Sequence, residues 1–238
     1  MAIEFRTVDS GIGILTFANA ANGNSVEEAD LIALRDQLEL LSKASLRALI
    51  VTGAGENFCH GRIGKKGLTS GAELADDLNH ILAVNERLSR FPVPVIAAVE
   101  GEALGFGCGF ATQCDITFAG EGAVFGLPEL SHGLPPLIVL SYLIKYVPLK
   151  RAFELALTSR HISAQEAAEI GIVTKAVAKG AALDTAIEMA RFIVTLNPRA
   201  VQQLRMYTRR VAGLHDDSFA QYGLYDIAAI LSERTTKS

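Results

Sequence analysis

Features that would mark a membrane protein or a nucleic-acid-binding protein are missing from this chain. No apolar stretch among the 238 residues reaches the roughly 18 residues that a membrane-spanning helix needs. Acidic residues outnumber basic ones, and the formal net charge of -4 argues against a nucleic acid as a partner. The first residues, MAIEFRTVDSG, do not follow the basic-then-apolar order of a signal peptide. We therefore expect neither a membrane nor a nucleic acid among the partners of this protein.

Cysteine is scarce, and the histidines are not clustered. The chain has three cysteines, Cys59, Cys108 and Cys114, and their spacing shows no pairing. Unpaired thiols are typical of a reducing compartment, so the pattern predicts reduced cysteines and a cytoplasmic location. No group of histidines stands at metal-ligand spacing, and we predict no metal site.

Apolar residues are plentiful and are arranged in short runs. Half of the residues are hydrophobic and 20% are charged, with no obvious linker between segments. Strands alternate with helices, an order typical of a single α/β domain with a largely parallel sheet and here a helical tail. The predicted strands are Ile3–Val8, Ile12–Phe17, Arg47–Thr52, Val93–Val99 and Ile172–Val177. The predicted helices follow Ser25 and Ser163 and span Gly71–Phe91, Leu137–Tyr146, Leu149–Thr158 and most of Ala181–Ser238.

Helix signals allow some side chains to be placed. Ser25 and Glu28 stand at capping-box spacing and predict the start of the first helix, and Ser163 with Glu166 predicts another start. Apolar residues three or four apart share one face of a helix, which is expected to point into the core. In the first helix this face comprises Leu31, Leu34, Leu38 and Leu41; in Gly71–Phe91 it comprises Leu74, Leu78, Ile81, Leu82 and Leu88.

The stretch from Pro92 to Pro136 carries the strongest functional signal. It begins with the apolar run Val93–Val99, which suits a strand buried on both faces. Glycines at alternate positions from Gly105 to Gly109 then open a short helix. Free N–H groups at a helix start attract an anion, or an oxygen on which negative charge develops during a reaction. Glu129 follows, so the stretch predicts a backbone donor site with one carboxylate.

These motifs resemble the crotonase family, the enoyl-CoA hydratases and isomerases. The resemblance rests on three segments in matching order: Asn57–Arg62, Val99–Ile116 and Phe125–Gly133. It implies a spiral of strand-strand-helix repeats with a C-terminal helical region, which we divide as residues 1–195 and 196–238. It also implies a homotrimer or a dimer of trimers, with the C-terminal helices packed between subunits.

The resemblance implies specific roles for three residues. The backbone N–H groups of Arg62 and Phe106 would hold the thioester oxygen of an acyl-CoA as an enolate forms. Glu129 would move the proton, and its apolar neighbours Phe125, Leu127 and Leu130 predict a raised pKa. Hydratases of the family carry a second glutamate where this chain has Gly109. Since moving a double bond from the 3-position to the 2-position needs only one proton-transferring group, we favour an isomerase over a hydratase.

The same resemblance predicts how the substrate is held. Coenzyme A enters as part of the substrate, and no separate cofactor is expected. Its predicted contacts are Cys59, His60, Gly61 and Lys65, together with Gly105 and Gly107. Arg205, Arg209 and Arg210 either face a CoA phosphate of a neighbouring subunit or form a basic helix face.

Several alternatives remain open from the sequence. The protein could be a hydratase, or a non-catalytic acyl-CoA binder that has kept the scaffold. The alternating glycines could belong to a dinucleotide fingerprint, although the third glycine is misplaced for one. His60 and His132 are each more typical of a structural role than of a catalytic one, although His132 would influence Glu129 if the local turn is helical.

Overall fold

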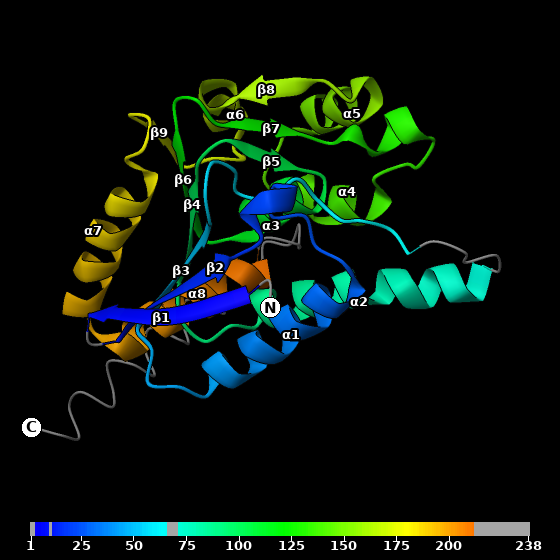
Figure 1. Ribbon diagram of the computed structural model, residues 1–238. Coiled ribbons are helices and arrows are strands. Elements are labelled where there is room, and N and C mark those ends of the chain that lie inside the picture. The colour runs from blue at the N-terminus through cyan, green and yellow to red at the C-terminus, as the bar shows by residue number, and fades with distance from the viewer. Residues whose placement is uncertain (1–2, 10, 66–70, 212–238) are drawn as a thin grey trace, which may run out of the picture.

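The computed structural model describes residues 3–9, 11–65 and 71–211. Two β-sheets and a set of surrounding helices make up this part of the chain (Figure 1). The strands are β1 (Ile3–Asp9), β2 (Ile12–Phe17), β3 (Ala48–Gly53), β4 (Val95–Val99), β5 (Glu102–Leu104), β6 (Ile116–Gly120), β7 (Val124–Gly126), β8 (His161–Ser163) and β9 (Lys175–Val177). The α-helices are α1 (Glu28–Ser42), α2 (Gly71–Ser89), α3 (Phe106–Gln113), α4 (Leu137–Leu143), α5 (Leu149–Thr158), α6 (Ala164–Ile170), α7 (Ala182–Thr195) and α8 (Pro198–Val211). Two 3₁₀ helices complete it, η1 (Ala20–Asn22) and η2 (Pro128–His132).

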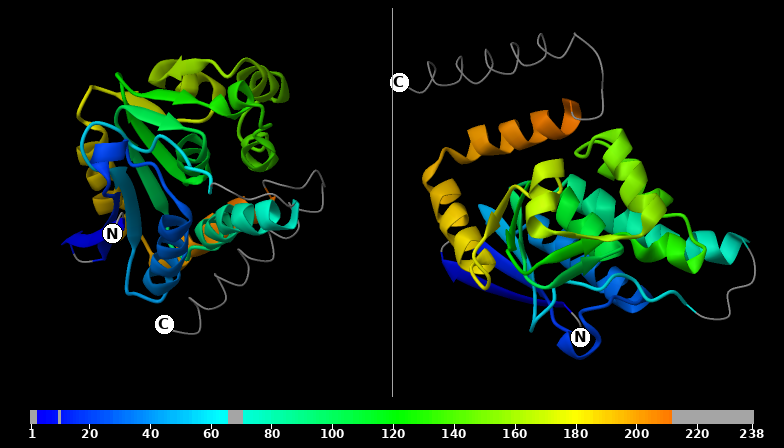
Figure 2. Two further views of the ribbon diagram at one scale, coloured as in Figure 1. Left: turned by 45° about the vertical axis from the view of Figure 1, so that its right-hand side comes forward. Right: turned by 90° about the horizontal axis from the view of Figure 1, so that it is seen from above.

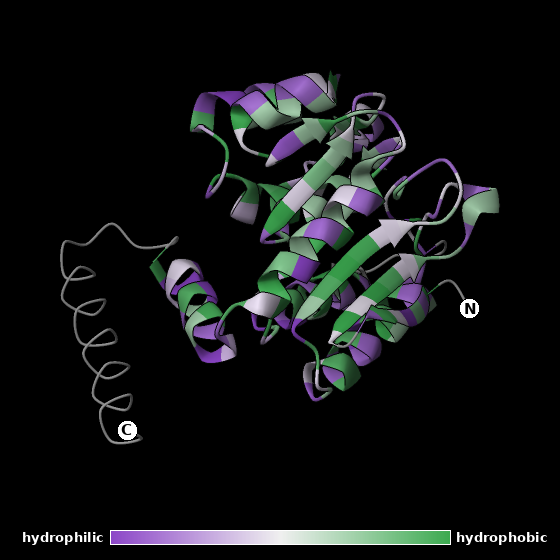
Figure 3. Cartoon of the chain, turned by 90° about the vertical axis from the view of Figure 1, so that its left-hand side faces the viewer, coloured by the Kyte–Doolittle hydropathy of each residue, from purple (hydrophilic) through white to green (hydrophobic). Residues whose placement is uncertain are grey.

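The larger sheet has six strands in the order β1-β2-β3-β4-β6-β9, and all pairs except β1–β2 are parallel. Alternate residues of each strand point to opposite faces, which gives the sheet two cores. Ile50 and Ile96 contribute to the face covered by α7, where Ala186 and Ala190 let the helix approach closely. The opposite face packs against α1, α2 and α3. Hydrophobic residues accordingly dominate these strands (Figure 3).

The smaller sheet has the order β5-β7-β8 and lies beside the larger one (Figures 1 and 2). Each repeat places its first strand in the large sheet and its second in the small sheet: β4 leads to β5, and β6 leads to β7. The segment after β3 behaves in the same way, because Cys59 forms a parallel bridge with Ala103 of β5. This is the predicted spiral of strand-strand-helix repeats. Four of its short strands, β5 to β8, were not predicted from the sequence, since three to five residues carry little periodicity.

Helix α1 starts at a different cap from the one predicted. The N-cap is Glu27, whose side chain forms a capping box with Asp30. Ser25 is unavailable because its hydroxyl bonds to Asn22 O, and Val26 N bonds to Gly61 O. The leucine stripe of α1 is buried as predicted. The Ser163 cap of α6 is confirmed, since Ser163 Oγ accepts a hydrogen bond from Glu166 N.

The inward face predicted for helix α2 is confirmed only in part. Leu78 and Leu82 are 39% and 48% exposed, while Ile81 and Leu88 are buried. The side chain of Leu74 lies outside the described residues. The buried face also contains Asp77, which pairs with Arg62. One end of α2 extends beyond the other described elements (Figure 1).

Helix α8 is bound to the core by buried ion pairs. Asp115 Oδ2 accepts hydrogen bonds from Val95 N and Arg205 Nε, and Asp115 Oδ1 accepts from Arg209 Nε at 2.9 Å. Arg205 also donates to Leu88 O at the end of α2. Both alternatives predicted for Arg205 and Arg209 are therefore wrong, because their guanidinium groups are used inside this chain. Residues 212–238, most of the predicted region 196–238, lie outside the described residues, and the division into two regions stays a prediction.

Changing Asp115 to asparagine is expected to lower the free energy of unfolding by about 3–5 kcal/mol, because it leaves the buried Arg205 and the partly buried Arg209 without their counter-charge. Asp36→Asn is the control: Asp36 pairs with Arg35 on the surface, and an exposed pair contributes about 1 kcal/mol or less. Urea denaturation of both variants measures the difference. Equal stability losses would contradict the structural role of Asp115.

Candidate active site

Three parallel segments end at the same edge of the small sheet and bring the predicted motifs together. Strand β5 lies in the middle, paired with Cys59 on one side and with β7 on the other. Parallel segments share an orientation, so their carboxyl ends meet at one edge. The residues that follow are Gly61 and Arg62, then Gly105 and Phe106, and finally Glu129 in η2. The sequence predicted these residues as a site, and the topology explains their proximity.

The glycines at this edge permit close contact between the segments. A methyl group on Gly61 would lie 3.0 Å from Leu104 O and 3.7 Å from Phe106 N. One on Gly105 would lie 3.1 Å from Glu129 Oε1. Both glycines have positive φ, +108° and +51°, a conformation that other residues adopt only with strain. One on Gly107 would overlap the Cys59 carbonyl oxygen. Any side chain here would push the three segments apart.

The two backbone N–H groups predicted to hold the thioester oxygen belong to segments that end at this edge. Val26 N donates a hydrogen bond to Gly61 O, and Val26 O accepts one from Ile63 N. Arg62 lies between these two residues, so its N–H faces the opposite side of the extended chain. Phe106 is the first residue of α3, where backbone N–H groups have no partner within the helix. Helix α3 adds the positive end of its dipole at the same place.

Glu129 lies beside these amides in partly buried surroundings. Its Oε2 atom is buried and has no hydrogen-bond partner among the described residues. Burial raises the pKa of Glu129 above its ordinary value, while its own backbone N–H and the nearby His132 lower it. The raised pKa agrees with the prediction from Phe125 and Leu127, both of which are fully buried. Glu129 and His132 lie in one 3₁₀ helix, η2. The turn between them is therefore helical, which is the condition under which His132 was expected to influence Glu129.

The space above Gly109 is filled by a residue that the sequence did not single out. A methyl group on Gly109 would overlap the hydroxyl oxygen of Tyr142 and lie 3.2 Å from Val139 Cγ1, both on α4. Tyr142 is 8% exposed, and its hydroxyl lies close to the side chains of Gln113 and Asn85, which are hydrogen-bonded to each other. Burial raises the pKa of Tyr142, as do Cys108 and Glu129, while hydrogen bonding with the side chains of Gln113 and Asn85 lowers it. No motif marks Tyr142, because it reaches the site only through the packing of α4 on α3.

The side chain of Arg62 points into a buried ion pair with Asp77 of α2. Arg62 Nε and Asp77 Oδ1 are buried without a further partner among the residues described. The pair ties the loop that carries the Arg62 amide to a helix. The sequence gave no sign of this contact, because the two residues are separated by a loop.

The residues predicted to contact coenzyme A have different environments. Cys59 is fully buried, and burial raises the pKa of its thiol to about 12, so it is no nucleophile. His60 is exposed, and its Nε2 lies 2.9 Å from Glu102 Oε2. Lys65 is exposed and pairs with Glu28 at 2.9 Å, which raises the pKa of Lys65. His60 and Lys65 thus stand on the surface next to the site, held by carboxylates.

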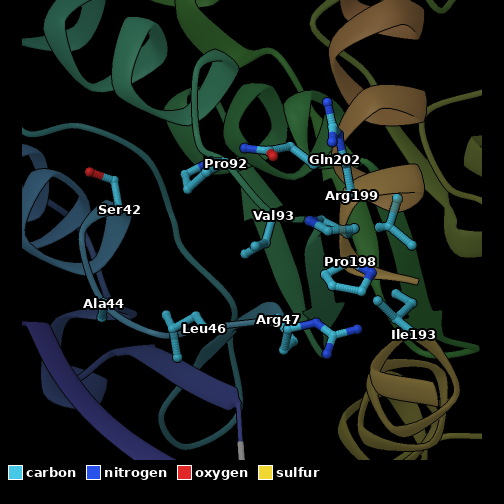
Figure 4. Close-up of a pocket in the computed structure, with 12 residues that line it drawn as sticks. Ser42, Ala44, Leu46, Arg47, Pro92, Val93, Ile193, Pro198, Arg199 and Gln202 are labelled. Carbon is cyan, nitrogen blue, oxygen red and sulfur yellow. The ribbon is translucent and has the colours of Figure 1, made fainter. Parts of the chain in front are cut away.

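A separate pocket of about 380 Å³ lies away from this edge (Figure 4). It is lined by residues before β3 and β4 and by the α7–α8 junction, among them Arg47, Pro92 and Pro198. Arg47 uses its Nη2 to bond to the carbonyl oxygens of Val194 and Leu196. The pocket thus lies at the amino ends of the strands, opposite to Glu129, and the guanidinium group of Arg47 is used in the fold.

Within the described ranges, no helix has the length and apolarity needed to cross a membrane, and no cluster of histidine, cysteine and acidic side chains has the geometry of a metal site.

A two-sheet spiral whose glycine turns meet beside a glutamate defines the crotonase-like class of α/β proteins. The model of the enoyl-CoA hydratase/isomerase family matches residues 7–220. The chain is 35% identical over 196 residues to a short-chain-enoyl-CoA hydratase of Clostridium acetobutylicum, which covers 77% of this chain and 70% of the relative. It is 32% identical to the 2,3-dehydroadipyl-CoA hydratase of Escherichia coli, over 83% and 78% of the two chains.

Solved structures of enoyl-CoA hydratases have the same fold as this chain. An enoyl-CoA hydratase of Mycobacterium smegmatis superposes with a TM-score of 0.93 at 26% identity, over 97% of this chain and 91% of the other. One from Bacillus anthracis gives a TM-score of 0.91 at 28% identity, over 98% and 92%. The chain belongs to the enoyl-CoA hydratase/isomerase family, as its motifs predicted.

Proposed function

We propose that the protein is an acyl-CoA isomerase that moves a double bond from the 3-position to the 2-position. The observation that carries this proposal is the arrangement around Gly109: Glu129 is the carboxylate beside the two amides, and Tyr142 occupies the place from which a second glutamate would project. A single proton-transferring group is sufficient for this reaction.

In the proposed mechanism, the thioester oxygen accepts hydrogen bonds from the N–H groups of Arg62 and Phe106. These donors are fixed before the reaction, so they stabilise the negative charge of the dienolate without reorganisation. Glu129 removes a proton from carbon 2 of the 3-enoyl chain and returns it to carbon 4. The double bond between carbons 3 and 4 is thereby replaced by one between carbons 2 and 3, and the carboxylate is regenerated. No other reactant is consumed.

A hydratase is the second candidate, and the names of the relatives favour it. Both curated relatives described above are hydratases. Hydration needs an activated water molecule as well as a proton at carbon 2, and the second glutamate that shares this work in hydratases is absent at Gly109.

Turnover of two substrates separates the candidates. Purified protein is incubated with 3-enoyl-CoA and, separately, with 2-enoyl-CoA of the same chain length. Formation of 2-enoyl-CoA from the first substrate supports the isomerase, and water addition to the second supports the hydratase. Binding of both without conversion of either would contradict both candidates and favour a non-catalytic binder.

The pH dependence should report the environment of Glu129. Since the base acts as a carboxylate, kcat/KM is expected to fall as the pH drops through its pKa, with a midpoint above the ordinary value of 4.5. His132→Gln removes a side chain that lowers this pKa, so the midpoint should move upward. A midpoint at or below the ordinary glutamate value would contradict the role of Glu129.

Substrate binding and assembly complete the proposal. We assign coenzyme A to the loop from Cys59 to Gly61 and to the surface residues His60 and Lys65. The backbones of Gly105 and Gly107 line the acyl end. A homotrimer or a dimer of trimers is the proposed assembly, and exposed apolar residues on α5, Leu149, Phe153 and Leu157, are compatible with burial between subunits.

A further inference from the structure

Arg62 serves the proposed site with its backbone, while its side chain is used elsewhere. The guanidinium group donates through Nη2 to Asp77 Oδ2 on α2 and forms an ion pair with that carboxylate. The two side chains are only 13% and 7% exposed, so salt and water screen the pair little. The residue that would supply one of the two donors to the thioester oxygen is thus anchored by a charge on a separate helix.

Hydrogen bonds hold the backbone around Arg62 along one edge. Val26 N donates to Gly61 O and Ile63 N donates to Val26 O, both at 2.9 Å. Gly61 directly before Arg62 has a φ of +108°, and glycine restricts the backbone less than any other residue. Two hydrogen bonds along one edge leave rotation about that edge unrestrained. The direction of the Arg62 N–H therefore depends on a further contact, and the ion pair with Asp77 provides one.

The described chain offers no substitute for this ion pair. Arg62 Nε and Asp77 Oδ1 are buried without another partner among the described residues, so no second group takes over when one member is lost. The same loop forms another ion pair, between Lys65 Nζ and Glu28 Oε2, but both side chains are largely accessible to water. Removing one partner of a buried pair leaves an uncompensated charge, whereas a surface pair contributes little. The Asp77 contact is therefore the stronger restraint on the loop.

We propose that Asp77 is a positioning residue for the oxyanion site: by holding the Arg62 guanidinium group, it fixes the direction of the Arg62 N–H. Asp77 acts through Arg62 and is not itself a catalytic residue. The inference rests on the proposed function, in which this N–H is one of two donors, and it adds α2 as the element that aligns the donor. Donors that are fixed in advance stabilise developing charge, so the ion pair contributes to enolate stabilisation and not to binding of the uncharged thioester.

Enolate binding tests the positioning role without turnover. Acetoacetyl-CoA is the probe, because its enolate absorbs ultraviolet light and carries negative charge onto the thioester oxygen. Asp77→Asn keeps the size of the side chain but leaves Arg62 without its counter-charge. It should lower the enolate-to-ketone ratio of the bound probe about 10- to 100-fold, the effect of a misplaced group. The kcat for 3-enoyl-CoA should fall similarly, while the dissociation constant of a saturated acyl-CoA stays within about threefold.

A second variant separates positioning from stability. Arg62→Met/Asp77→Leu removes both charges, and apolar side chains of similar volume often restore the stability that is lost with one charge. We expect this variant to have a thermal midpoint near that of the wild type but to keep the lowered enolate ratio. Recovery of both would mean that the pair contributes only to stability and would overturn the inference. An unchanged enolate ratio in Asp77→Asn, or equal losses of enolate and saturated-ligand binding, would also overturn it.

Glu39→Gln is the matched control, because Glu39 of α1 also pairs with α2, through Arg87 at 3.2 Å, but at the surface and far along the helix from Asp77. It should keep the wild-type enolate ratio and kcat. The probe also distinguishes this inference from the proposed function. A protein that does not isomerise 3-enoyl-CoA but stabilises the enolate in an Asp77-dependent way would refute the isomerase and support the inference. Isomerisation at an equal rate by the wild type and Asp77→Asn would support the isomerase and refute the positioning role.

Discussion

Replacing Glu129 by glutamine is expected to lower kcat for double-bond migration by about 10²–10⁴-fold, the usual contribution of a general acid–base group. Glutamine keeps the size of the side chain but cannot accept a proton. The carboxylate is also the group that lies beside Gly105 and has a buried, unpartnered oxygen. Because no acyl-CoA contact is removed, the dissociation constant of a saturated acyl-CoA should stay within a few fold.

Steady-state kinetics and calorimetry together check this expectation. Glu121→Gln serves as the control, since Glu121 is an exposed carboxylate in the turn before β7, and it should behave like the wild type. An active Glu129→Gln variant would remove the base from the mechanism. Loss of binding in parallel with the loss of turnover would mean that Glu129 holds the substrate instead of transferring its proton.

Replacing Gly61 by alanine is expected to lower kcat about 10²–10³-fold, the effect of losing one oxyanion donor. The new methyl group would press against Leu104 O at 3.0 Å and close to Phe106 N. The positive φ of Gly61 adds backbone strain of about 1–3 kcal/mol. The chain must then shift at the peptide that carries the Arg62 N–H, and this moves the donor away from the thioester oxygen.

Gly64→Ala is the control for this prediction because it lies in the same loop. A methyl group on Gly64 meets only Arg62 Nη1, at 3.9 Å, and its φ is not positive. This variant should therefore keep near wild-type kcat. Circular dichroism and thermal denaturation show whether both variants are folded. Equal activity of a folded Gly61→Ala variant and the wild type would argue against an amide pair built on this turn.

Local patterns predicted the local parts of the structure well. The leucine stripe of α1 is buried, and the run Val93–Val99 contains the fully buried strand β4. The prediction failed in part of α2, where Leu78 and Leu82 are exposed and Asp77 is buried in a pair with Arg62. Periodicity contains no information about such a partner in another segment.

Some residues of the candidate site could be predicted from the sequence, and others could not. Its motifs, with Gly61, Gly105 and Glu129, were recognisable because the family keeps them at fixed spacing in the chain. Tyr142 and the Asp115 cluster were not, since each depends on which helix packs against which. A single tyrosine on an apolar helix has no signature that separates a core residue from one that faces a ligand.

The sequence by itself therefore determined the helices, five of the six strands of the larger sheet, the glycine turns, the acid beside them and the family. Only the tertiary structure decided that three parallel segments end together, that Tyr142 fills the space above Gly109, and that α8 is held by Asp115. The physical reason is that backbone conformation depends on neighbouring residues, whereas side-chain contacts across the fold depend on how entire elements pack.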